Sequence, residues 1–85
     1  MMTREEAQKE ALIIIDEHIA AEGENAIAFM APQPGKNSWT WKEVRKSTIN
    51  DAPLEGIKDG NFIDDMLAFD KWRQEHIGYK QKIKN

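Results

Sequence analysis

The sequence has no cysteine and no long apolar run. Without thiols the chain has no disulfide framework, no zinc–thiolate site and no cysteine nucleophile. The apolar runs at residues 12–15 and 26–31 are short, whereas a helix needs roughly 20 apolar residues to span a bilayer. The charged residues at the start of the sequence are not followed by the apolar segment of a secretory signal. We therefore expect a cytoplasmic protein that does not associate with membranes.

Proline, glycine and aromatic residues are also few, as is usual in a small folded domain. The 85 residues are 40% hydrophobic and 32% charged, which suits one small core and does not resemble a disordered chain. A chain this short buries a smaller share of its surface than a large protein does. We expect a single domain over residues 1–85 whose stability is marginal or assisted by a partner.

The charge of the chain is segregated into blocks of alternating sign. Residues 1–31 carry two positive and seven negative side chains, and residues 51–70 carry one and six, so each block has a net charge of −5. Residues 32–50 and 71–85 have net charges of +3 and +4. Such blocks can attract one another within one fold or between copies of the chain, although solvated helix faces would give the same pattern.

A capping box predicts the start of the first helix. Thr3 is followed three residues later by Glu6, so the hydroxyl can accept from a free backbone N–H while the glutamate reaches back. No proline or glycine follows until Gly23, a typical C-terminal stop. The predicted helix, about 4–22, has an apolar face at three- and four-residue spacing: Ala7, Ala11, Leu12, Ile15 and Ile19. Two further isoleucines between Leu12 and Ile15 widen this face, as expected for a helix covered on two sides or buried in an oligomer.

A second capping box, Thr40 with Glu43, predicts a helix over about 41–49. In this register Trp39 immediately precedes the cap and Val44 is the fourth helical residue. A hydrophobic residue before the cap commonly packs on the fourth helical residue, an arrangement called the hydrophobic staple. The spacing therefore predicts a structural role for Trp39.

The role of Trp41 is left open by the sequence. Trp41 is the first residue of the predicted helix, three residues before Val44 and four before Arg45. Its indole can either point toward the core beside Val44 or lie under the guanidinium of Arg45.

The third predicted helix covers about 62–77. Asn61 is a suitable N-cap with Asp64 in the first turn, and Gly78 predicts the end of the helix. Its main apolar stripe consists of Phe62, Met66, Phe69 and Trp72. The basic tail from about residue 79 is expected to be frayed.

Residues 24–38 form a long, partly apolar connection that the sequence does not resolve. Residues 26–31 are apolar, and Pro32 and Pro34 prevent a helix from continuing. The segment can be a short helix capped by Asn25 or an extended stretch over the core; a lone strand would need a partner in a neighbouring subunit. With three helices and this connection, the predicted fold is all-α, a small three-helix domain.

No arrangement of residues in the sequence predicts catalysis or a metal site. His18 and Glu22 are four residues apart on one helix, but a metal site needs more ligands than this pair provides. Asp64, Asp65 and Asp70 do not share one helix face, and His76 has no nucleophile at a recognisable spacing. We therefore expect no enzymatic activity, no metal and no cofactor.

Two basic patches contain aromatic residues, a combination typical of nucleic-acid binding. One consists of Lys36, Lys42, Arg45 and Lys46 with Trp41, and the other of Lys71, Arg73, Lys80, Lys82 and Lys84 with Trp72 and Tyr79. Acidic blocks interrupt both patches, and phosphate binding would require those carboxylates to face away. Nucleic-acid binding is therefore the alternative hypothesis.

The favoured hypothesis is a small accessory or structural subunit that binds another protein or assembles with copies of itself. The chain has more apolar residues than a core of this size buries readily. The candidate interface residues are Ile13, Ile14, Ile27, Phe29, Met30, Trp41, Arg45, Trp72 and Arg73. Size and acidity also fit a small inhibitor from a mobile element or virus that imitates nucleic acid.

Overall fold

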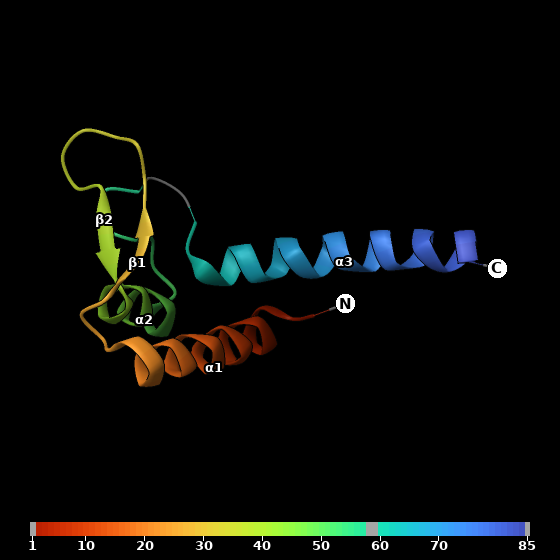
Figure 1. Ribbon diagram of the computed structural model, residues 1–85, viewed down its shortest axis with the longest axis horizontal. Coiled ribbons are helices and arrows are strands. Elements are labelled where there is room, and N and C mark those ends of the chain that lie inside the picture. The colour runs from red at the N-terminus through yellow and green to blue at the C-terminus, as the bar shows by residue number, and fades with distance from the viewer. Residues whose placement is uncertain (1, 58–59, 85) are drawn as a thin grey trace.

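The computed structural model describes residues 2–57 and 60–84, and the side chains up to residue 76. In the described residues the helices and strands are, in chain order, α1 (Arg4–Glu22), β1 (Ile27–Met30), β2 (Ser38–Thr40), α2 (Trp41–Asn50) and α3 (Phe62–Lys84) (Figure 1). The three predicted helices are therefore confirmed. The fold is mostly helical, with a small antiparallel sheet of two strands.

Helix α1 begins and ends where the sequence predicts. The backbone N–H of Glu6 donates to the Thr3 hydroxyl at 3.1 Å, and the N–H of Thr3 donates to the Glu6 carboxylate at 3.0 Å. The helix ends at Gly23, whose φ of 94° is readily adopted only by glycine. Ala7, Ala11 and Ile15 are fully buried and form the inward face of the helix.

The prediction of a purely all-α fold is wrong, because residues 24–38 contribute to a β-hairpin. Strand β1 pairs with β2 in antiparallel fashion, with Phe29 opposite Trp39 and Met30 opposite Ser38. The strand partner thus comes from the same chain and not from a neighbouring subunit. The proline-containing loop reverses the chain, helped by Gly35 with φ of 79°.

Trp39 is the largest fully buried side chain, which confirms its predicted structural role. It lies in one core cluster with Ile15 of α1 and Val44 of α2. Its indole Nε1 donates a hydrogen bond of 2.9 Å to the Glu55 carbonyl. The ring therefore joins the hairpin to two helices and to the loop that follows α2.

Helix α2 carries the second predicted capping box. Thr40 accepts from the N–H of Glu43 at 3.3 Å, and the Glu43 carboxylate accepts from the N–H of Thr40 at 3.2 Å. A hydrogen bond and ion pair of 2.7 Å from Lys36 lower the pKa of Glu43. The helix ends at Asn50, one residue later than predicted, and is followed by Asp51 in the left-handed conformation.

Helix α3 starts as predicted but extends well past its predicted end at residue 77. The side-chain oxygen of Asn61 accepts from the N–H groups of Ile63 and Asp64 at 2.8 and 3.3 Å. Gly78 does not end the helix, which continues to Lys84. A glycine inside a helix costs only about 1 kcal/mol relative to alanine, and the lysines and glutamine after it favour helix. The fraying of the tail stays a prediction.

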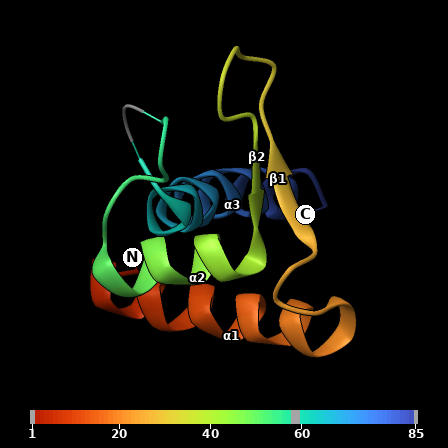
Figure 2. The ribbon, with the colours of Figure 1, turned by 90° about the vertical axis from the view of Figure 1, so that its left-hand side faces the viewer.

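The elements form a small body from which the C-terminal half of α3 projects. Helices α1 and α2 pack against each other, the hairpin rises beside α2, and α3 crosses above α1 (Figure 2). Helix α3 then runs beyond the start of α1 (Figure 1). The buried hydrophobic side chains are Ala7, Ala11, Ile15, Trp39, Val44 and Ile63.

A cluster of polar side chains joins one end of each helix. Arg4 at the start of α1 donates from Nε to Asp51 at 2.7 Å and from Nη1 to Asp64 at 2.8 Å. Asn61 also donates to Asp51, at 2.9 Å. These hydrogen bonds, led by that from Arg4, lower the pKa of Asp51 from 3.8 to about 2.

Replacing Trp39 by alanine is expected to destabilise the protein by about 3–5 kcal/mol, because it leaves a large cavity at the centre of the core. That loss is a large part of the roughly 5–15 kcal/mol that stabilises a typical domain. Trp39→Phe keeps an aromatic ring and loses the bond to Glu55, so a smaller loss is expected. Denaturant unfolding followed by circular dichroism measures the loss of stability in both variants. Equal midpoints for Trp39→Ala and the wild type would contradict this role.

The Arg4 cluster predicts a specific loss of stability in acid. Because the pKa of Asp51 is lowered in the folded chain, its contribution is complete above the ordinary value of 3.8 and is lost as the pH falls through about 2. We expect Arg4→Gln to be less stable than the wild type at neutral pH. We also expect its free energy of unfolding to change less with pH in this window. Urea midpoints measured across the window test this.

The matched control is Lys9→Gln, which removes an exposed ion pair of 3.8 Å with Glu5 on the same helix. Exposed pairs of this kind contribute little to stability, so its acid profile is expected to follow that of the wild type. An Arg4→Gln profile parallel to the wild type would contradict the assignment.

Candidate functional site

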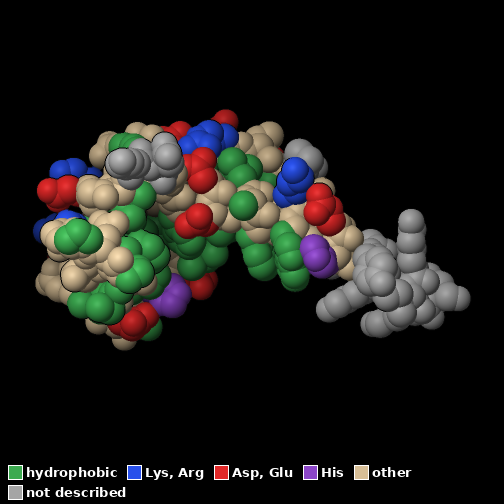
Figure 3. All heavy atoms as spheres, turned by 90° about the horizontal axis from the view of Figure 1, so that it is seen from above, with side chains coloured by type: hydrophobic (Ala, Val, Ile, Leu, Met, Phe, Trp, Pro, Cys, Tyr) green, Lys and Arg blue, Asp and Glu red, His purple; other side chains and the backbone are tan. Residues whose placement is uncertain are grey.

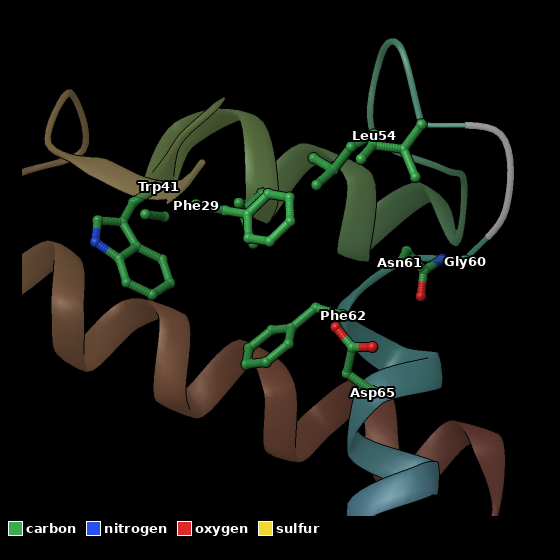
Figure 4. Close-up of a pocket in the computed structure, with 10 residues that line it drawn as sticks. Phe29, Trp41, Leu54, Gly60, Asn61, Phe62 and Asp65 are labelled. Carbon is green, nitrogen blue, oxygen red and sulfur yellow. The ribbon is translucent and has the colours of Figure 1, made fainter. Parts of the chain in front are cut away.

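A pocket of about 330 Å³ lies between the hairpin, α2 and the start of α3. Its walls include Phe29 of β1, Trp41 of α2 and Phe62 of α3, with Leu54 and Ile57 from the loop after α2. Phe29 and Phe62 point toward the same space, and the carboxylate of Asp65 borders it (Figure 4). The pocket is therefore mostly apolar, with one acidic group at its edge.

Trp41 forms one end of this pocket and does not lie under Arg45. Its indole is half-buried and stacks on the His18 ring, with centroids 4.4 Å apart and planes inclined by 10°. His18 Nδ1 lies 2.7 Å from the Glu22 carboxylate. Arg45 instead binds Asp16 at 2.8 Å. The indole Nε1 is buried without a hydrogen-bond partner among the described residues, and it points away from Phe62 (Figure 4).

Asp65 is the charged group of the pocket and lies exposed at its edge. Loss of hydration beside the pocket raises the pKa of its carboxyl, and repulsion from Asp64 raises it further. Among the described residues no cation offsets these two effects. Asp64 differs because a hydrogen bond from Arg4 lowers its pKa. Among the described residues, Asp64 thus has a paired cation and Asp65 has none.

Aromatic side chains continue along α3 beyond the pocket. Phe69 and Trp72 are 55% and 51% exposed, and their rings stack with centroids 6.0 Å apart. The Trp72 ring also stacks on His76 at 4.2 Å. Hydrophobic side chains lie on both sides of the hollow between the body and α3 (Figure 3). We call the concave face the surface formed by Phe29, Trp41, Phe62, Asp65, Phe69 and Trp72.

The predicted interface residues are divided between this face and other surfaces. Trp41 and Phe29 line the pocket, and Trp72 is exposed further along α3. Ile27 and Met30 are exposed on β1, and Ile13 is exposed on α1. Ile14 is half-buried. Arg45 and Arg73 form ion pairs within the chain, with Asp16 at 2.8 Å and Asp70 at 3.6 Å.

Sequence reasoning missed Leu54, Ile57, Phe62, Asp65 and Phe69 as parts of the site. Phe62 and Phe69 belong to the main apolar stripe of the third predicted helix, and such a stripe usually faces the core. The wide spread of apolar positions around 62–77 was the available signal, since a helix packed on one side needs only one stripe. The pocket itself depends on the hairpin, which the sequence did not predict.

The candidate acidic and histidine residues do not converge on one point. Among the described residues no three His, Asp or Glu side chains lie close enough together to hold a metal ion. Asp64 binds Arg4, whereas Asp70 is buried and accepts from the backbone N–H of Met2 at 3.2 Å. Within the same part of the chain, no helix combines the length and apolarity required to cross a bilayer.

Comparisons with protein-family models, with curated proteins and with solved structures give no match.

Asp65→Asn is expected to raise the Tm of the single chain at about pH 7. The pKa of Asp65 is raised in the folded chain, so the protonated carboxyl favours the folded state. This contribution to stability is lost as the pH rises through the raised pKa. The gain is expected to vanish at about pH 2, where the wild-type carboxyl is protonated in both states. Thermal unfolding of dilute protein at the two pH values measures the difference.

Asp64→Asn is the contrasting variant, since the pKa of Asp64 is lowered by Arg4. It is expected to lower the Tm at about pH 7. A lower Tm for Asp65→Asn at that pH would mean that its charge stabilises the fold, contrary to the description above.

Proposed function

We propose that this chain is a non-enzymatic protein-binding module, an accessory or structural subunit that docks through its concave face. The observation that carries the proposal is the uncovered aromatic stack of Phe69 and Trp72 beside an apolar pocket. Large aromatic side chains gain most from burial and are enriched at the centres of protein interfaces. A contiguous apolar face of this kind is typical of a docking surface.

The position of the face on rigid elements supports the same function. Phe62 follows the Asn61 cap, and Trp41 follows the Thr40 capping box, so both side chains are held by well-defined helix starts. A partner that binds such a surface loses little free energy to ordering it. The face thus has the fixed geometry that specific docking needs.

Nucleic-acid binding is less well supported by the arrangement of basic side chains. Lys36 pairs with Glu43 at 2.7 Å, and Arg45 with Asp16 at 2.8 Å. Arg73 lies 3.6 Å from Asp70 and 6.0 Å from the Phe69 ring. Phosphate groups would have to compete with these carboxylates. Salt-dependent retention on DNA or RNA would favour this alternative.

Photo-crosslinking in the source cell tests the proposed function. A photoreactive phenylalanine analogue replaces Phe29 or Trp72, one on each side of the concave face. The control position is Ile13, which is 59% exposed on α1 and does not line the pocket. We expect both test positions to give the same protein adduct and Ile13 to give none.

Mass spectrometry of the adducts identifies the crosslinked molecule, including another copy of this chain. Adducts of equal yield from all three positions would mean that contact is non-specific. No adduct from either test position would contradict docking through this face, and nuclease-sensitive adducts would favour nucleic acid.

A further inference from the structure

The projecting part of α3 has an aromatic side that the body does not cover. We call residues 69–84 the arm; it extends past the start of α1 (Figure 1). Phe69 and Trp72 are about half exposed, and Trp72 stacks on His76 of the same helix. The opposite side of this region is anchored, since Asp70 is buried and binds the N–H of Met2. The start of the arm is therefore held in place, and among its described side chains Phe69 and Trp72 stay about half exposed.

The residues on the aromatic side of α3 follow a seven-residue repeat. Positions separated alternately by three and four residues are Phe62, Asp65, Phe69, Trp72 and His76, and the spacing continues in the sequence to Tyr79 and Ile83. This alternation is the spacing of a coiled-coil seam, along which one helix packs against another. Phe62 and Asp65 line the pocket, so the seam begins there. This spacing is typical of a helix side that packs against another helix.

The exposed area of the chain is larger than its mass accounts for. A compact monomer of 9.8 kDa is expected to expose roughly 5,200 Å², whereas this chain exposes 6294 Å². Its radius of gyration is 15.0 Å, against about 12 Å for a compact domain of 85 residues. The difference in area, about 1,100 Å², is comparable with the roughly 800 Å² that each partner contributes to a stable interface.

We infer that the concave face is covered by the arm of a second copy, with the two arms antiparallel about a two-fold axis near Trp72. The inference rests on the proposed function and names its partner. In this register Trp72 lies opposite Trp72, and Phe69 lies opposite His76. Phe62 is about 15 Å along the helix from the axis, so it lies opposite the last turns of the other arm. The end of each arm thus reaches the pocket of the other copy.

Charge favours this antiparallel arrangement over a parallel one. Residues 71–85 have a net charge of +4, and residues 51–70 have −5. Antiparallel arms place each basic end beside Asp65 of the other copy, whose carboxylate has no cation among the described residues. Parallel arms would place the two basic ends together, where they repel. The same contact is then made twice, so the assembly closes as a dimer.

The mass in solution across a dilution series tests the dimer. We expect twice 9.8 kDa at high concentration, falling toward 9.8 kDa on dilution. Trp72→Glu is expected to raise the dissociation constant at least about a hundredfold, because it places two carboxylates at the axis. Asp65→Asn is expected to raise the dissociation constant as well, although the same change stabilises the single chain. Ile13→Glu is the control and is expected to leave the dissociation constant unchanged.

Cysteine crosslinking tests the register, since the chain has no cysteine of its own. On oxidation Trp72→Cys is expected to give a covalent dimer, because the two positions meet at the axis. Phe62→Cys is expected to give none, because its two copies lie roughly 30 Å apart and a disulfide needs Cα atoms within about 7 Å. Crosslinking at both positions would indicate parallel arms and overturn the register.

A monomer at every concentration would overturn the dimer. If photo-crosslinking at positions 29 and 72 then gives an adduct with a different protein, the proposed function stands and only the second copy is excluded as partner. If it gives no adduct, both proposals fail.

Discussion

The burial of a single indole ring holds the parts of this small domain together. Trp39 is carried by β2, packs on Ile15 and Val44, and donates its Nε1 proton to the Glu55 carbonyl. It therefore fixes the hairpin on the two packed helices and also fixes the loop after α2. Part of the wall of the pocket comes from this hairpin and this loop. Without the buried ring, Phe29 and Leu54 would have no defined positions, and the concave face would lose one side.

The direction of α3 follows from a second set of contacts, which are polar. Arg4 and Asn61 hold Asp51 and Asp64 at the junction of the three helices, and the buried Asp70 binds the start of the chain. These contacts lie on the side of α3 that faces α1. They set the angle at which the helix leaves the body, and they leave the side with Phe69 and Trp72 uncovered. Folding thus produces an exposed aromatic side in a fixed orientation.

Local signals in the sequence predicted the helix starts well, and nonlocal features were missed. The capping boxes at Thr3 and Thr40 and the cap at Asn61 each depend on residues within one turn. The hairpin depends on pairing two strands of four and three residues across a loop, and such short strands have little propensity signal of their own. The end of α3 was misplaced because glycine stops a helix only when the next residues favour leaving it.

The concave face was predicted only in part for the same reason. Phe29, Trp41 and Trp72 were recognised as surplus to a small core. Phe62 and Phe69 were predicted only as members of an apolar stripe, because spacing alone does not say which of two apolar stripes on a helix faces inward. In the structure the buried Ile63 and Asp70 mark the inward stripe of α3, and the aromatic seam lies on its other side.

Closure of the inferred assembly depends on where the arm and the pocket lie in one chain. If an arm entered a neighbour's pocket without receiving that neighbour's arm, each copy would keep one free arm and one free pocket, and the contact would repeat as an open filament. The arm is part of α3, and Phe62 and Asp65 of the same helix line the pocket, so the seam runs through both features. An antiparallel pair of α3 helices therefore satisfies both features of both copies in one contact. A two-fold dimer leaves no arm or pocket free, so this contact does not extend beyond two copies.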